Sequence, residues 1–136
     1  GMMVLPTQTQ GIGPFAGHQG RWINRPSDAA QETAAMALYV ALVADAALDL
    51  IGSENMLVVD GRFANASVFT RALATLRGTT EVYTSSAEHD ISLGALRLIQ
   101  PELRQKRKLD RVAPLDAPLL DYRSRWRQGL EGCSCG

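Results

Sequence analysis

The chain has 136 residues, 46% of them hydrophobic, and its 14 Lys and Arg residues balance 14 Asp and Glu residues. A chain of this size and composition can bury the core of one globular domain, which excludes a disordered polypeptide. Because the formal net charge is zero, nothing in the charge balance points to a nucleic acid or an anionic membrane surface as a partner.

Two features bear on the cellular compartment. The apolar stretch from Met2 to Pro6 is too short for a secretory signal, and polar residues follow it. The two cysteines, Cys133 and Cys135, both lie in the last four residues. We therefore expect a reduced, cytoplasmic protein.

Three regions differ in composition. Residues 1–26 begin with a short apolar stretch, which we expect to form a strand, and continue as a loop rich in Gly, Pro, Gln and Thr. The loop is long for a connection, which favours either a functional loop or a missing neighbour. Residues 27–100 carry the patterns of regular structure. Residues 101–136 form a basic tail with one amphipathic stretch near Tyr122 and Trp126.

The segment after Pro26 predicts a long helix. Ser27 can cap its N-terminus, and no Gly or Pro interrupts the chain until Gly52. Every residue from 34 to 44 is apolar or Tyr, which is typical of a helix buried on nearly all sides. These 11 residues are too few to span a bilayer, and Asp45 follows directly. We therefore expect a central core helix rather than a membrane anchor.

Strands and helices alternate after this helix. Residues 56–59 form a short apolar run that predicts a buried parallel strand, and residues 80–83 predict a second strand. Apolar residues at helical spacing predict helices over 68–76, closed by Gly78, and over 91–99. This order implies an α/β fold, with a short and mostly parallel sheet whose strands are joined by crossover helices.

The turn after the first predicted strand is the most informative candidate site. A strand that passes through glycine into a helix presents free backbone amides, which favour phosphates and other anions, and glycine lets a ligand approach the backbone. A glycine at such a turn can equally serve backbone conformation alone. The sequence contains neither a GxGxxG nor a GxxxxGK[ST] motif. The candidate binding residues are Asp60, Gly61, Arg62 and Asn65.

The remaining candidates provide neither a catalytic residue nor a set of metal ligands. His18 and His89 lie far apart without ligand spacing, so hydrogen bonding or solvent exposure is favoured for each over metal binding. Cys133 and Cys135 could hold a metal or oxidise, but thiols in a terminal tail are usually mobile. The basic run over residues 104–111 lacks interleaved aromatics, which favours a solvated face.

Short stretches of this sequence follow one another in a recognisable order. They are Val58-Val59-Asp60-Gly61, Ala74-Thr75-Leu76-Arg77-Gly78, Glu81-Val82-Tyr83 and Leu93-Gly94-Ala95-Leu96, preceded by Leu5-Pro6, Gly13-Pro14-Phe15 and Gly17-His18-Gln19-Gly20. They resemble the C-terminal domain of the FGGY carbohydrate kinases. The tail around Tyr122 and Trp126 is similar to the short C-terminal helix of these kinases.

This resemblance implies part of an RNase H-like, actin-like (ASKHA) ATPase domain, with a long buried helix beside its sheet. The family phosphorylates a sugar or polyol hydroxyl with ATP, and Mg²⁺ serves the full-length enzymes. By this match Asp60, Gly61, Arg62 and Asn65 would lie against ATP or ADP. Four residues depart from the family pattern, two of them Tyr39 and Val40, which stand where the family often has Glu-Gly in its core helix. Asp60 stands where the first glycine is usual, and Arg62, in place of a small residue, could stack on adenine, pair with phosphate or block the pocket.

No stretch of the chain resembles the N-terminal domain of the family, which carries an Asp-Gly-Thr phosphate loop and much of the sugar site. The family's catalytic base would lie before Met2. Since phosphoryl transfer depends on positioning and on a base within hydrogen-bond reach, we expect no turnover from the chain alone. A sugar would then bind only together with the missing half.

Two functional hypotheses remain open. In the first, the chain is the C-terminal, nucleotide-side portion of an ATP-dependent carbohydrate kinase. In the second, the same fold serves as a non-catalytic binding or oligomerisation module, and a second copy or another polypeptide covers its apolar surface and strand edges. The two hypotheses are compatible with each other.

Overall fold

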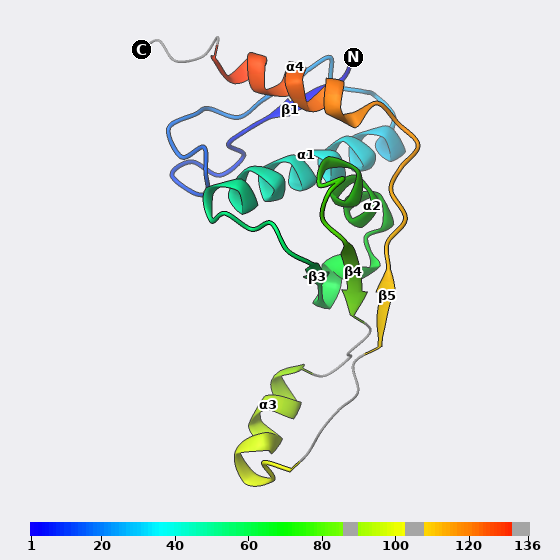
Figure 1. Ribbon diagram of the computed structural model, residues 1–136. Coiled ribbons are helices and arrows are strands. Elements are labelled where there is room, and N and C mark those ends of the chain that lie inside the picture. The colour runs from blue at the N-terminus through cyan, green and yellow to red at the C-terminus, as the bar shows by residue number, and fades with distance from the viewer. Residues whose placement is uncertain (86–89, 103–107, 132–136) are drawn as a thin grey trace.

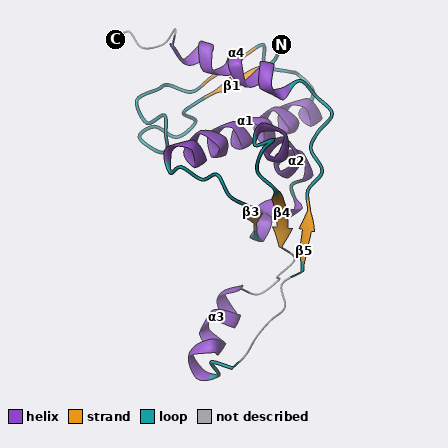
Figure 2. Ribbon diagram, in the orientation of Figure 1, coloured by secondary structure: helices purple, strands orange, loops and turns teal. Residues whose placement is uncertain are grey.

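A computed structural model describes residues 1–85, 90–102 and 108–131. These residues form two small sheets and four α-helices, shown by secondary structure in Figure 2. The elements run in the order β1 (Met3–Leu5), β2 (Arg21–Ile23), α1 (Ala29–Leu50), β3 (Leu57–Val59), the 3-10 helix η1 (Gly61–Asn65), α2 (Ser67–Leu76), β4 (Val82–Ser85), α3 (Asp90–Ile99), β5 (Leu109–Arg111) and α4 (Leu119–Glu131).

The long helix predicted after Pro26 is confirmed as α1. Asp28, rather than the predicted Ser27, caps it, since the Asp28 carboxylate accepts a hydrogen bond of 3.0 Å from the backbone N–H of Gln31. At the other end Gly52 has a φ of +66°, a left-handed conformation that glycine adopts without strain.

The expectation of a buried core helix is confirmed for the apolar stretch. From residue 34 to residue 48 every position of α1 is buried or half-buried, whereas Leu50 at its end is 73% exposed. By length and composition α1 could also cross a membrane, a test that core helices of soluble proteins pass as well. In this fold α1 packs against α2 and β1, and the consecutive residues 40–44 belong to the core or pack against it.

The predicted parallel pair of strands is confirmed. β3 and β4 are parallel, with Val58 opposite Tyr83, although β4 begins two residues later than the predicted strand over 80–83. The sheet is nevertheless mixed, because β5 pairs with β4 in antiparallel register. β5 lies inside the predicted basic tail, where no strand was expected. The sequence does not predict β5 because two of its three residues are charged, so it lacks the apolar run of a buried strand. All three residues, Leu109, Asp110 and Arg111, are exposed.

Helix α3 is confirmed at Asp90–Ile99, but it is not the crossover helix that the alternating pattern predicted. It connects two antiparallel strands, β4 and β5, and Figure 1 shows it extending away from the body that α1, α2 and α4 form. The residues from Ala95 to Gln100 are all exposed. The helical spacing of the apolar residues therefore predicted that α3 is a helix, but it did not predict where the helix lies relative to the sheet.

The two ends of the chain meet in the core. The expected N-terminal strand is β1, which pairs with β2 in antiparallel register, and the short C-terminal helix is α4 (Figure 1). Trp126 of α4 is 1% exposed, and its indole Nε1 donates a hydrogen bond of 2.7 Å to the carbonyl oxygen of Val4. Met3, Leu5 and Leu130 belong to the same core cluster. The fold thus depends on contacts between its first and last elements.

Candidate functional site

The turn that the sequence singles out joins β3 to α2 through η1. Asp60 is the N-cap of η1, and its Oδ1 accepts a hydrogen bond of 2.7 Å from the backbone N–H of Gly61. Asp60 is half-buried, whereas Gly61, Arg62 and Asn65 are exposed. The structure therefore brings these four candidate residues together in one surface turn at the end of a strand.

The backbone at Gly61 is open to an approaching ligand. Its φ is +67°, and a Cβ placed on this residue would meet no atom within 4 Å. The positive φ alone accounts for a glycine, because L side chains rarely adopt this conformation. The same geometry leaves one side of the peptide backbone uncovered, so a flat group can lie against it.

The expectation that the glycine leads directly into a helix with free amides is wrong. Five residues of η1 separate β3 from α2, and the N–H of Gly61 is already bonded to Asp60. Phe63 explains this extra turn, since its ring packs on Phe69 of α2 with the ring centroids 5.3 Å apart. The first turn of α2 begins only at Ser67. A ligand here would thus contact the turn itself rather than the end of a long helix.

The other candidates from the sequence are dispersed. His18 lies in the loop between β1 and β2, and within the described residues no group of three His, Cys, Asp or Glu could hold a metal ion. His89, Cys133 and Cys135 lie outside the described residues. Of the basic run, Arg111 of β5 forms an ion pair of 2.9 Å with Glu81 and keeps its side chain 68% exposed.

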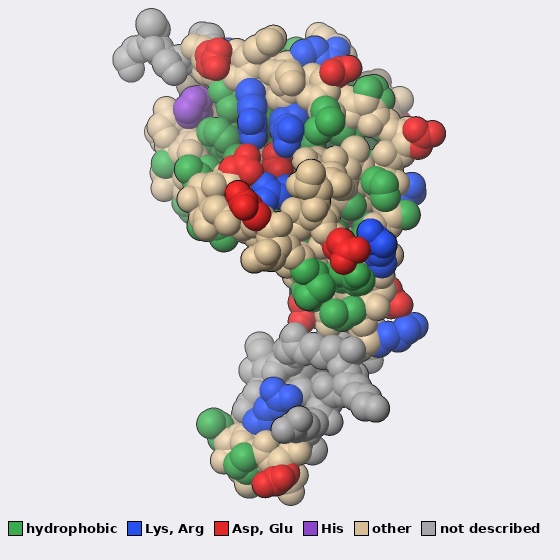
Figure 3. Space-filling model, in the orientation of Figure 1, with side chains coloured by type: hydrophobic (Ala, Val, Ile, Leu, Met, Phe, Trp, Pro, Cys, Tyr) green, Lys and Arg blue, Asp and Glu red, His purple; other side chains and the backbone are tan. Residues whose placement is uncertain are grey.

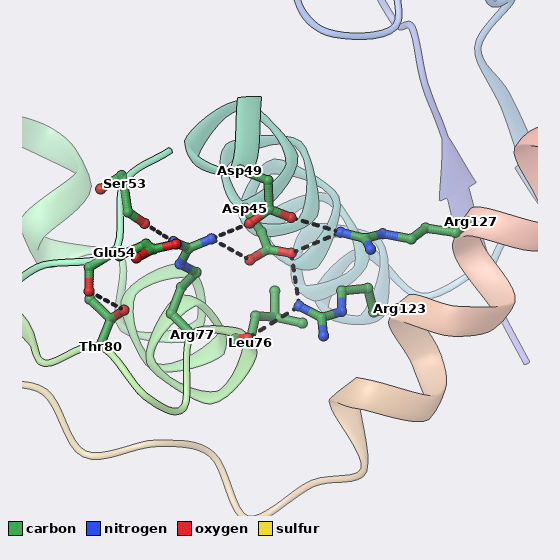
Figure 4. Close-up of polar contacts among 9 residues, drawn as sticks. All are labelled: Asp45, Asp49, Ser53, Glu54, Leu76, Arg77, Thr80, Arg123 and Arg127. Atoms are coloured by element: carbon green, nitrogen blue, oxygen red, sulfur yellow. Dashed lines mark hydrogen bonds and ion pairs between the residues drawn. The ribbon is translucent and has the colours of Figure 1, made fainter. Parts of the chain in front are cut away.

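A charge cluster around the buried Asp45, which the sequence analysis missed, joins three helices (Figure 4). Asp45 of α1 is 1% exposed and lies 3.1 Å from Arg123, 3.5 Å from Arg77 and 3.6 Å from Arg127. Asp49, one turn later, lies 2.5 Å from Arg77 and 3.0 Å from Arg127. Figure 3 shows acidic and basic side chains gathered on this face of the molecule.

Most of the charge in this cluster is compensated within it. Three guanidinium groups face two carboxylates, and Glu54 lines a neighbouring pocket of about 440 Å³ together with Arg77 and Arg123. The guanidinium of Arg77 also donates to the backbone oxygen of Ser53, and that of Arg123 donates to the backbone oxygen of Leu76. Each of the three guanidinium groups thus has carboxylate partners within the protein, so the cluster acts as a structural clamp between the helices.

The spacing of the acidic and basic residues is the signal that could have revealed this clamp. Asp45 and Asp49 are four residues apart, as are Arg123 and Arg127, so each pair lies on one face of its helix. In the sequence, the acidic residues that follow the apolar stretch 34–44 within this helix indicate only that the helix is not a membrane span. Their partners in α4 lie 78 positions later in the chain, and spacing alone does not indicate such a pairing.

The comparisons with known proteins bear directly on this architecture. A family model described as the C-terminal domain of FGGY carbohydrate kinases matches residues 1–107. The chain belongs to this family. The search of curated proteins found no match. Among solved structures, the chain is similar to a carbohydrate kinase from Novosphingobium aromaticivorans, at 50% sequence identity and a TM-score of 0.87.

The FGGY match confirms the resemblance drawn from the sequence and the α/β, ASKHA-like architecture that it implied. The similarity to the Novosphingobium kinase covers 98% of this chain, so it includes α4, which lies beyond the residues that the family model matches. The chain spans 29% of the length of that kinase. The matched region contains the turn from Asp60 to Asn65.

Proposed function

We propose that this FGGY domain is the nucleotide-side portion of an ATP-dependent carbohydrate kinase, which transfers a phosphoryl group to a sugar or polyol hydroxyl. The observation that carries the proposal is the exposed turn at Gly61, in a chain of this family, where the backbone is open on one side. ATP or ADP would lie against Gly61, with Asn65 and Arg62 beside it. ATP, together with Mg²⁺, supplies the phosphoryl group when bound.

The charges at the turn suit this role in part. Arg62 is exposed and provides a guanidinium that can pair with a phosphate or stack on a base. The carboxylate of Asp60 would repel a phosphate, but it is turned toward the N–H of Gly61. We therefore place the adenosine part, rather than the phosphates, against Gly61. Turnover needs groups that the matched domain lacks, so we propose that the 136-residue chain alone is inactive.

Amide NMR of the chain titrated with ADP tests the site. We expect chemical-shift changes centred on Gly61 and its neighbours, and a loss of these changes in Gly61→Ala, because the new methyl group would stand where the nucleotide meets the backbone. Gly52→Ala is the matched control: Gly52 has a φ of +66° and equally open surroundings, but it lies at the end of α1. No shift at millimolar ADP, or an equal effect of both variants, would refute the nucleotide site.

A second candidate function is a binding or oligomerisation module. It is favoured by exposed apolar side chains on α3, where Leu98 and Ile99 are 87% and 80% exposed, and beside the edge strand β3, where Met56 is 55% exposed. Apolar patches of this kind mark contacts with another copy or another polypeptide. Sedimentation of the chain, compared with Leu98→Glu, tests it: we expect self-association that the variant abolishes. A monomer with both sequences would contradict this function.

A further inference from the structure

Strand β4 ends beside the turn that carries Gly61. β3 and β4 lie side by side (Figure 1), and their parallel register sets Val59 opposite Thr84. One residue further along, the same register places Asp60 opposite Ser85, on strands that run about 4.8 Å apart. β4 also contacts η1. Ser85 therefore lies at the carboxyl end of the two parallel strands, which is the edge where α/β sheets bind their ligands.

The side chains of Ser85 and Asp60 lie on the same face of the sheet. Side chains alternate between the two faces along a strand, and residues opposite one another share a face. Val82 is 1% exposed and faces the core. Tyr83 and Ser85 of β4 alternate with it and with Thr84, so they lie on the outer face. On this face Ser85 is next to Asp60, the residue that caps η1.

The hydroxyl of Ser85 has no hydrogen-bond partner among the described residues, although Ser85 is only 5% exposed. The other two hydroxyls of β4 are engaged. That of Tyr83 donates to a carboxylate oxygen of Glu81 over 3.1 Å, and that of Thr84 donates to the backbone oxygen of Asp110 over 3.4 Å. A buried hydroxyl without a partner is unfavourable and rare in folded proteins. One hydroxyl at this edge is therefore available to a group that the described fold does not supply.

We propose that the hydroxyl of Ser85 forms a hydrogen bond with the nucleoside part of the bound nucleotide. This inference rests on the proposed nucleotide site at Gly61. A serine side chain has three staggered rotamers, so its hydroxyl can turn toward a ligand at Asp60 without a movement of the strand. A hydroxyl both donates and accepts, which suits a ribose hydroxyl or a ring nitrogen of the base. The neighbouring carboxylate of Asp60 disfavours a phosphate at the same place, because like charges repel.

This contact is made only in the complex. Because the hydroxyl of Ser85 is unpartnered in the free chain, a bound nucleoside satisfies it without breaking a hydrogen bond of the protein. Ser85→Ala therefore removes a contact with the ligand but no hydrogen bond of the free fold. Binding and stability respond differently to this substitution, unlike at a residue that only holds the strand in place.

Amide NMR titrations with ADP, followed through the shifts at Gly61, test the contact. We expect ADP to bind Ser85→Ala about fivefold more weakly, which is the factor for one ordinary hydrogen bond. Thr84→Val is the matched control. It removes the neighbouring hydroxyl of β4, which lies on the core face and donates to Asp110, so it should bind ADP as the unchanged chain does. Unchanged ADP affinity in Ser85→Ala, or an equal loss in both variants, would overturn the inference.

Two further measurements separate the nucleoside contact from a phosphate contact and from folding. Adenosine should bind Ser85→Ala more weakly by the same factor as ADP, and a loss confined to ADP would overturn a nucleoside contact. The Tm of Ser85→Ala should equal or exceed that of the unchanged chain. A lower Tm would show that the hydroxyl already has a partner in the free fold, which also overturns the inference.

The same titrations distinguish this inference from the proposed function. If ADP binds the unchanged chain and Ser85→Ala equally well, only the contact at Ser85 is refuted. If ADP shifts no resonance of the unchanged chain, the nucleotide site is refuted and the contact at Ser85 with it.

Discussion

The carboxylate of Asp45 in α1 lies 3.1 Å from the guanidinium of Arg123 in α4, and this contact joins two helices that are 78 residues apart in sequence. Arg77 approaches the same carboxylate from the end of α2. A charge that is 1% exposed needs such partners, since burial without them is prohibitively costly. The three helices are therefore held together by charge as well as by apolar packing.

Asp45→Asn should destabilise the domain strongly. The substitution leaves Arg77, whose side chain is 10% exposed, with less compensating charge in a buried place. Breaking a buried pair in this way costs about 3–5 kcal/mol. Urea unfolding followed by circular dichroism would measure the loss. Asp49→Asn is the matched control: its side chain is 48% exposed, so a loss below about 1 kcal/mol is expected. Equal losses in the two variants would contradict the clamp.

Trp126→Phe should weaken the contact between the two ends of the chain. The phenyl ring keeps most of the apolar packing, but the carbonyl oxygen of Val4 loses its 2.7 Å partner in a buried position. An acceptor left unsatisfied costs about 1–3 kcal/mol. Thermal unfolding should show the lower stability, and hydrogen exchange should show faster exchange in β1. An unchanged Tm would mean that the indole hydrogen bond contributes nothing to the fold.

Gly20→Ala should open the loop between β1 and β2, which the hydrogen bond from the backbone N–H of Gly20 to the carbonyl oxygen of Thr7 closes. The new Cβ would stand 2.3 Å from the backbone oxygen of Thr7, so the closing hydrogen bond must break or the backbone must shift. Gly17→Ala, in the same loop, would meet no atom within 4 Å and should change little. Amide shifts of residues 7–20 distinguish the two variants, and similar spectra for both would argue against a closed loop.

Stability should fall at alkaline pH through Tyr122. Burial raises the pKa of this hydroxyl above its ordinary value of 10.0, and the hydroxyl donates to the carbonyl oxygen of Met2 over 3.1 Å. A raised pKa in the folded state means that stability is fully present below pH 10 and is lost as pH rises above it. Urea unfolding between pH 9 and about 11 should show a smaller decline in Tyr122→Phe. The same decline in both proteins would exclude Tyr122 as its source.

Local patterns in the sequence were sufficient to predict most of the elements. The helix predicted after Pro26 ends before Gly52, the parallel strands β3 and β4 flank an amphipathic helix, and the order of several short motifs indicated the family that the comparison shows. These features depend on hydrophobic periodicity, helix-capping residues and the positions of glycines, each of which can be recognised within a few residues of sequence. They indicated the fold class, the family and one surface turn.

Only the tertiary structure decided the contacts between distant segments. The pairing of Asp45 with Arg123, the antiparallel addition of β5 and the closure of the loop at Gly20 each join residues whose local patterns do not refer to one another. The local sequence does not distinguish a charged side chain that is solvated from one that pairs with a buried carboxylate. Their role is fixed by what lies opposite them in space, because desolvation and charge compensation act at contact distance.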